Sequence, residues 1–187
     1  MNSNLVFFSN FLKNPAEVAA ISPSSKYVIS KIIKNIDFSN AECIVEYGPG
    51  IGTITKPVLE NLAPDAKLIC LESNAKFCSF LTKDIKDPRL IVINDTAQNL
   101  DLHIKRLNIT NVDYVLSGIP FSLIKTENKK DIIKKTKDSL RGGGKFIVYQ
   151  QYNWHLKKYL SIYFKKISTD AEIRNIPPTL IFACEKI

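Results

Sequence analysis

The sequence predicts a doubly wound α/β fold, an open and mostly parallel sheet with helices on both faces. Short apolar runs alternate with stretches of helical periodicity, and such runs fit strands that are buried on both sides. The apolar content of 45% and the charged content of 24% are typical of a globular chain. The candidate strands are Cys43–Tyr47, Leu68–Leu71, Leu90–Ile93, Tyr114–Leu116 and Phe146–Tyr149.

Helical patterns lie between these strands and after them. Gly142, Gly143 and Gly144 are expected to stop the fourth helix and to turn the chain into a strand. Pro177 and Pro178 separate two further strand candidates, which suit an antiparallel C-terminal hairpin in a seven-stranded sheet. Residues 1–40 are expected to form a helical extension of one domain that spans 1–187. The expected helices are 53–62, 74–84, 97–107, 124–141 and 154–166, and the last strands are 171–176 and 179–185.

The bulk composition narrows the class of protein. A net charge of +8 favours polyanionic partners, either phosphate backbones or anionic lipid surfaces, although a lysine-rich proteome gives the same charge without any partner. No run of 18 apolar residues and no signal peptide are visible. The four cysteines lack a C-x-x-C spacing, which indicates buried thiols in a reducing cytoplasm and no metal site.

A glycine-rich turn follows the first strand. Gly48, Gly50 and Gly52 stand at alternate positions, where only glycine takes positive φ angles and lets a ligand approach the backbone closely. The spacing differs from the dinucleotide pattern. It resembles the first motif of S-adenosylmethionine-dependent methyltransferases, although a purely structural turn is the alternative. The expected cofactor residues here are Glu46, Tyr47, Gly48, Pro49, Gly50 and Gly52.

Acidic residues end three successive strands of the predicted sheet. Glu72 follows the second strand and can accept two hydrogen bonds from a ribose diol, and Ser73 is placed beside it. Asp95, followed by Thr96, ends the third strand and can accept a proton from an adenine amino group. Glu46 can orient the loop or bind the amino group of the methionine part. One such acid is often only a helix cap, but three together predict a cofactor site.

The fourth strand runs into a turn that suits methyl transfer to nitrogen. Positive charge passes to the nitrogen as it attacks a sulfonium methyl group, so backbone carbonyls and an aromatic face stabilise it. The alternative is an ordinary turn that ends a strand at a proline. The residues expected to line the transfer site are Ser117, Gly118, Ile119, Pro120 and Phe121.

This turn resembles the Asn-Ile-Pro-Tyr motif of ribosomal RNA adenine dimethylases, but Gly118 replaces their asparagine. It is closer to bacterial phospholipid N-methyltransferases, which methylate phosphatidylethanolamine. Further similar stretches are Phe11–Pro15 with Ile21–Ser25, Val148–Tyr152 and Arg174–Pro178. The resemblance implies a Rossmann-like methyltransferase sheet, S-adenosylmethionine as cofactor and an aminophospholipid as acceptor. It also implies that acceptor contacts come from Ser24, Ser25, Tyr149, Tyr152 and Arg174.

Two alternatives stay open at this point. An RNA adenine N6-methyltransferase is supported by the charge and by the Pro-Phe turn, and opposed by Gly118 and by the absence of a helical RNA-binding domain after the sheet. The second alternative is a methyltransferase fold that binds cofactor or RNA without turnover. Arg174 can hold a phosphate bidentately or be an ordinary surface cation.

A lipid acceptor requires contact with a membrane surface, so the resemblance implies a cytoplasmic protein that is peripheral on the inner face. Near the N-terminus, Leu5, Phe8, Phe11 and Leu12 share one helical face that can lie in the headgroup layer. Residues 154–167 form a second amphipathic candidate with lysines beside an apolar stripe. The favoured interpretation of this second stripe is packing on the sheet.

Overall fold

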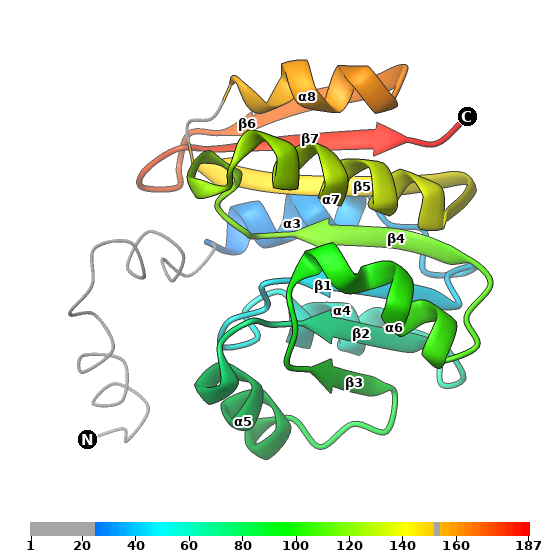
Figure 1. The fold of residues 1–187 in the computed structure, drawn as a ribbon. Coiled ribbons are helices and arrows are strands. Elements are labelled where there is room, and N and C mark those ends of the chain that lie inside the picture. The colour runs from blue at the N-terminus through cyan, green and yellow to red at the C-terminus, as the bar shows by residue number, and fades with distance from the viewer. Residues whose placement is uncertain (1–24, 152–153) are drawn as a thin grey trace.

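A seven-stranded sheet forms the centre of the molecule in the computed structural model, which describes residues 25–151 and 154–187 (Figure 1). The strand order is β3-β2-β1-β4-β5-β7-β6. The first five strands run parallel, and β7 is antiparallel to both of its neighbours. The predicted fold and its antiparallel C-terminal hairpin are thus confirmed. The strands are β1 (Cys43–Tyr47), β2 (Lys67–Leu71), β3 (Leu90–Ile93), β4 (Val112–Ser117), β5 (Leu140–Gln151), β6 (Lys166–Glu172) and β7 (Thr179–Glu185).

Helices cover both faces of this sheet (Figure 1). One apolar core joins the sheet to α6, α7 and α8, and a second core joins its other face to α3 and α4. Because each central strand is covered on both sides, its side chains are almost all buried, as in other parallel sheets. The α-helices are α3 (Lys26–Lys34), α4 (Thr55–Asn61), α5 (Ala75–Asp84), α6 (Leu100–Arg106), α7 (Thr126–Ser139) and α8 (Leu156–Tyr163), with 3₁₀ turns η1 (Ala97–Asn99) and η2 (Phe121–Leu123).

The C-terminal third differs from its predicted boundaries. The helix expected at 154–166 ends at Tyr163, and the strand expected at 171–176 is β6, which covers Lys166–Glu172. An edge strand needs no continuous apolar run, and the exposed lysine, serine and aspartate positions of β6 hide its strand character in the sequence. The stripe on α8 packs on the sheet, because Leu156 and Leu160 belong to the core.

The glycines at 142–144 do not end a helix. The helix α7 ends at Ser139, and β5 begins at Leu140, so the three glycines lie inside the strand. The register between β4 and β5 shifts here. A Cβ on Gly144 would lie 2.9 Å from the Asp113 carbonyl oxygen, which explains the need for glycine at this irregularity. Among the cysteines, Cys43, Cys70 and Cys184 are buried as expected, but Cys78 is only half-buried.

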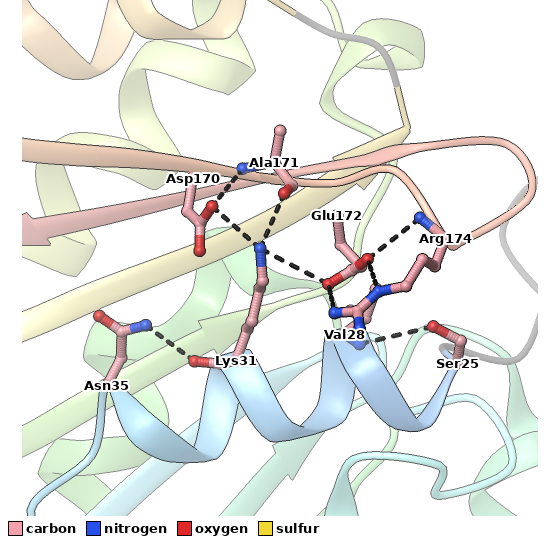
Figure 2. A network of polar contacts seen from close by, with 8 residues as sticks. All are labelled: Ser25, Val28, Lys31, Asn35, Asp170, Ala171, Glu172 and Arg174. Carbon is pink, nitrogen blue, oxygen red and sulfur yellow. Dashed lines mark hydrogen bonds and ion pairs between the residues drawn. The ribbon is translucent and has the colours of Figure 1, made fainter.

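A polar network joins α3 to the end of β6 (Figure 2). The Arg174 guanidinium donates to both carboxylate oxygens of Glu172, at 2.7 and 2.8 Å, and Lys31 Nζ lies 3.5 Å from the same carboxylate. These hydrogen bonds lower the pKa of the buried Glu172 to about 2. Lys31 also donates to Asp170 Oδ1 and to the Ala171 carbonyl. The network fixes the chain before the β6–β7 turn against the helix.

A second buried acid, Glu46, lies under the glycine loop. Its Oε2 accepts a hydrogen bond from Thr55 Oγ1 at 2.7 Å, at the start of α4. Its Oε1 has no partner within the described residues, and the side chain is fully buried. Burial therefore raises the pKa of Glu46 to about 7, against an ordinary value of 4.5.

We expect Glu46→Gln to remove a pH dependence of stability. Because its pKa is raised in the folded state, the protonated carboxyl contributes fully to the free energy of unfolding below pH 4.5. This contribution is lost as the pH rises towards about 7. Relative to the variant, the wild-type chain should lose about 3 kcal/mol of unfolding free energy between pH 4.5 and 7.5. Urea unfolding across this range measures the difference, and parallel pH curves for the two proteins would contradict the raised pKa.

Candidate functional site

A cavity of about 600 Å³ lies at the carboxyl ends of β1, β2, β3 and β4, which is where ligands bind in doubly wound sheets. The turns that follow these strands bring part of the predicted cofactor set and the centre of the predicted transfer turn, Gly118 to Pro120, to the same cavity. The lining includes Gly48, Gly50, Leu71, Glu72, Ser73, Asn74, Phe77, Asp95, Thr96, Ala97, Gln98, Gly118, Ile119, Pro120, Leu123, Ile124, Lys125, Asn128 and Ile132.

The glycine loop lies directly against the turn after β4. Gly48 has a φ of +65°, and a Cβ placed on it would lie 2.8 Å from Ile119 Cγ2. Gly50 has a φ of +57° but faces open space. Glycine is therefore required at 48 for both conformation and room, and at 50 for conformation alone.

Glu72 connects the glycine loop to the turn after β2. Its Oε2 accepts from the Gly50 backbone N–H at 3.1 Å, and its Oε1 accepts from the Asn74 N–H at 2.9 Å. Burial raises the pKa of Glu72. The side chain faces the cavity, so its carboxylate oxygens can also accept hydrogen bonds from a ligand diol.

Asp95, at the end of β3, is already well bonded. Its carboxylate accepts from the Thr96 N–H at 2.7 Å and from Asn99 Nδ2 at 2.8 Å, and His103 Nε2 lies 2.8 Å from Oδ2. The contact with His103 is the main cause of a lowered pKa for Asp95. The carboxylate is thus held ionised at the cavity wall. The Thr96 N–H donates to this carboxylate, so it is not available to donate to a ligand.

The turn after β4 is held by β5. The Ile119 carbonyl accepts from the Phe121 N–H at 2.9 Å and from the buried Gln150 side chain at 2.8 Å, while the Pro120 carbonyl accepts from the Leu123 N–H. No donor within the described residues reaches the Gly118 carbonyl. Of these three carbonyls, that of Gly118 is the one left for an incoming amine.

Tyr149 covers Gly118 from β5. A Cβ on Gly118 would lie 2.7 Å from the Tyr149 hydroxyl and 3.0 Å from its ring, so residue 118 has no room for a side chain. Gly118 lines the cavity, and Tyr149 packs directly behind it without being one of the lining residues. Burial raises the pKa of Tyr149 well above 10, so the hydroxyl stays protonated at neutral pH.

Several predicted site residues lie away from the cavity. Glu46 bonds Thr55 beneath the loop, which fits its orienting role and takes it away from a ligand. Tyr47 is buried against Thr136 on α7, and Ser117 and Phe121 are buried in the core. Pro49 and Gly52 do not line the cavity.

The predicted acceptor residues are scattered in the same way. Ser25 caps α3, and its backbone N–H donates to Asn175 Oδ1 at 3.1 Å. Arg174 is paired with Glu172. Ser24, Tyr152 and the N-terminal aromatic stripe lie outside the described residues.

Sequence reasoning missed part of the cavity lining. Phe77 and Ile132 bring apolar walls from α5 and α7, and Lys125 and Asn128 add polar groups near the transfer turn. Asn74 had a readable signal, because it caps α5 just after the strand-end acid. Phe77 and Ile132 carried no such signal in the sequence, because an apolar helix residue that faces a ligand has the same periodicity as one that faces the core.

Comparisons with known proteins agree with this geometry. The family model described as ribosomal RNA adenine dimethylase matches residues 2–120. An ornithine lipid N-methyltransferase from Singulisphaera acidiphila is 26% identical over 188 residues, which cover 100% of this chain and 98% of the relative. A probable ribosomal RNA small subunit methyltransferase A from Methanosphaera stadtmanae is 29% identical over 106 residues, 54% of this chain and 38% of that protein.

Solved structures share the fold. A precorrin-6y C5,15-methyltransferase from Geobacter metallireducens superposes with a TM-score of 0.69 at 12% identity, covering 89% of this chain and 92% of that one. The glycine loop packed on the turn after β4, the acids at the strand ends and the matched family model lead to one assignment. The chain belongs to the ribosomal RNA adenine dimethylase family and is a class I enzyme that uses S-adenosylmethionine to transfer methyl groups.

Proposed function

We propose that this enzyme methylates the primary amine of a membrane-lipid headgroup. The observation that carries the proposal is the packing of Tyr149 on Gly118, which leaves no side chain at 118 to pair with the edge of a nucleobase. The relative matched along its whole length is named as an ornithine lipid N-methyltransferase. Phosphatidylethanolamine, expected from the sequence, and an ornithine lipid share the acceptor chemistry, a primary amine on a short alkyl chain.

The cavity fits the cofactor. In this proposal the Gly48 and Gly50 backbone leaves room for the methionine part, Glu72 accepts hydrogen bonds from the ribose hydroxyls, and Asp95 accepts one from the adenine amino group; all four residues line the cavity. Phe77 and Ile132 provide apolar walls for a flat base. Bound S-adenosylmethionine supplies an electrophilic methyl group. The chain's own task is to place the acceptor nitrogen in line with that group and to exclude water.

The acceptor nitrogen is placed between two polar groups of the chain. The Gly118 carbonyl accepts one N–H of the amine, and the Tyr149 hydroxyl oxygen accepts another. Both oxygens favour the positive charge that grows on nitrogen. Since its raised pKa keeps Tyr149 protonated, this residue orients the amine, and the proton released after transfer passes to water.

RNA adenine methylation is the second candidate, and the family model and the Methanosphaera relative favour it. The match to that relative covers only about half of this chain, and Gly118 has no side-chain amide that could pair with a base. A binding module without turnover has less support, because the transfer turn Gly118 to Pro120 lines the same cavity as the cofactor residues and the family is one of methyltransferases. No helix of the described residues is long and apolar enough to cross a bilayer. Contact with lipid therefore calls for an anionic membrane surface, which suits a net charge of +8.

Methyl transfer from radiolabelled cofactor tests the proposal directly. Purified protein is incubated in parallel with vesicles that contain phosphatidylethanolamine, with vesicles that contain an ornithine lipid, and with total RNA. Label in either lipid supports the proposal, and the two vesicle arms identify the headgroup. Label in RNA alone contradicts it, and label in none of the three supports the binding module.

We expect Glu72→Gln to weaken cofactor binding about 10- to 100-fold, roughly 1.4 to 2.8 kcal/mol, because two charge-assisted hydrogen bonds to the ribose diol are weakened. Isothermal titration with S-adenosylhomocysteine measures the loss. Glu60→Gln, on the exposed surface of α4, is the matched control and should bind like the wild type. Equal affinities for all three proteins would remove Glu72 from the ribose site.

Tyr149→Phe keeps the ring over Gly118 and removes only the hydroxyl. We expect kcat for lipid methylation to fall about tenfold, the value of one hydrogen bond to a charged nitrogen, with cofactor affinity unchanged. Tyr163→Phe, at the end of α8, changes a tyrosine that packs on the other apolar core and not on Gly118, and should retain full activity. An unchanged kcat in Tyr149→Phe would show that the hydroxyl does not meet the amine.

A further inference from the structure

The turn between β6 and β7 exposes two isoleucines to solvent. Ile173 is 77% exposed and Ile176 is 89% exposed, and among the large hydrophobic residues in the described part of the chain only Ile187, at 82%, is comparable. Single exposed apolar residues are common on protein surfaces. Here two exposed isoleucines lie on one short turn, with Arg174 between them, and form a small apolar patch beside the arginine.

This turn is not loosely held. Asn175 is buried and makes hydrogen bonds to the Ser25 N–H, the Pro177 carbonyl and Thr179 Oγ1. Arg174 is fixed to Glu172, and its guanidinium stacks on the Tyr27 ring at 3.8 Å. Figure 2 shows the ion pairs of Lys31 that join the end of β6, just before the turn, to α3. The isoleucines are therefore presented on a rigid support, so little conformational entropy is lost when they are buried by a partner.

The turn lies at the edge of the sheet where the cavity opens. Glu172 and Thr179, which flank it, pair with each other, and Thr179 pairs with Gln151 at the carboxyl end of β5. Figure 1 places this turn, the start of α8 and the segment after β4 at the same edge. Exposed Trp154 precedes α8, and exposed Leu123 follows β4 and lines the cavity. Exposed apolar side chains thus lie along the same edge of the sheet as the cavity, and one of them, Leu123, lines it.

Positive charge accompanies these apolar side chains. Exposed Lys26 begins α3 beside the turn, and exposed Lys125 lines the cavity, whereas the charge of Arg174 is balanced by Glu172. The acid nearest to the turn, Glu172, is buried and already paired with two cations. A basic rim around apolar points complements an anionic lipid surface, where each basic residue contributes about 1 kcal/mol.

We propose that Ile173 and Ile176 on the β6–β7 turn, together with Trp154 and Leu123, dock the enzyme on an anionic bilayer. The turn enters the headgroup layer, and the cavity entrance then faces the lipid amines. This inference rests on the proposed lipid acceptor, and it names a membrane-contact surface separate from the N-terminal stripe and from α8. A second copy of the chain is a poorer occupant, because a narrow, rigid turn offers little flat surface to a partner with the same net charge of +8.

Co-flotation with vesicles of phosphatidylglycerol and phosphatidylethanolamine tests the surface without any need for methyl transfer. We expect Ile176→Ser to lower the partition constant about tenfold and the Ile173→Ser/Ile176→Ser pair to lower it about a hundredfold. Ile187→Ser is the matched control, because Ile187 is equally exposed but follows β7, which ends at the opposite edge of the sheet. Thermal unfolding and cofactor titration of each variant verify that the fold is kept.

A second arm separates docking from catalysis. On a short-chain, monomeric aminophospholipid the isoleucine variants should match the wild type, while on vesicles their rates should fall with the partition constant. Vesicle binding equal to that of the wild type, or an equal loss in Ile187→Ser, overturns the docking surface. So does wild-type protein that ignores vesicles, or variants that change only dimer formation or RNA binding. Absence of transfer to monomeric and vesicle lipids alike, with flotation intact, would instead count against the proposed acceptor.

Discussion

The site depends on the close approach of two backbone segments, the glycine loop after β1 and the turn after β4. No Cβ fits on Gly48, because Ile119 Cγ2 would lie 2.8 Å away, and none fits on Gly118, because Tyr149 covers it. Gly48 therefore allows direct contact between the glycine loop and the turn after β4, and Gly118 allows that turn to pack on Tyr149 of β5. The strand order sets this arrangement, since β1 and β4 are adjacent and parallel and their carboxyl ends meet. The spacing between the glycine loop and the turn after β4 is thus set by the sheet.

The two strand-end glutamates show how side-chain direction divides similar residues into different tasks. Glu72 faces the cavity and accepts from the Gly50 N–H, and its oxygens can also accept hydrogen bonds from a ligand. Glu46 is buried under the loop, where Thr55 is its partner and its pKa is raised to about 7. One acid can bind the cofactor directly, while the other anchors α4 under the loop that surrounds the cofactor.

The central strands, the glycine loop and the acids at strand ends were predictable, because burial on both faces leaves continuous apolar runs and because tight turns need glycine. The edge strand β6 was not, since half of its side chains face water. Arg174 was expected at the acceptor and is instead paired with Glu172, a contact that the spacing alone cannot distinguish from a free cation. The cover of Gly118 by Tyr149 joins residues on adjacent strands, and only the register between β4 and β5 reveals it.

The most direct measurement compares Gly48→Ala with Gly50→Ala, in cofactor affinity and in single-turnover methyl transfer. Both residues have positive φ, so both variants carry a similar strain of about 1 kcal/mol. Only the new methyl group at 48 meets Ile119, whereas that at 50 meets no protein atom and enters the cavity, so its effect falls on cofactor affinity. We expect Gly48→Ala to lose transfer at least tenfold more than Gly50→Ala, even at saturating cofactor. Equal losses in the two variants would contradict the claim that the cofactor loop and the transfer turn form one packed unit.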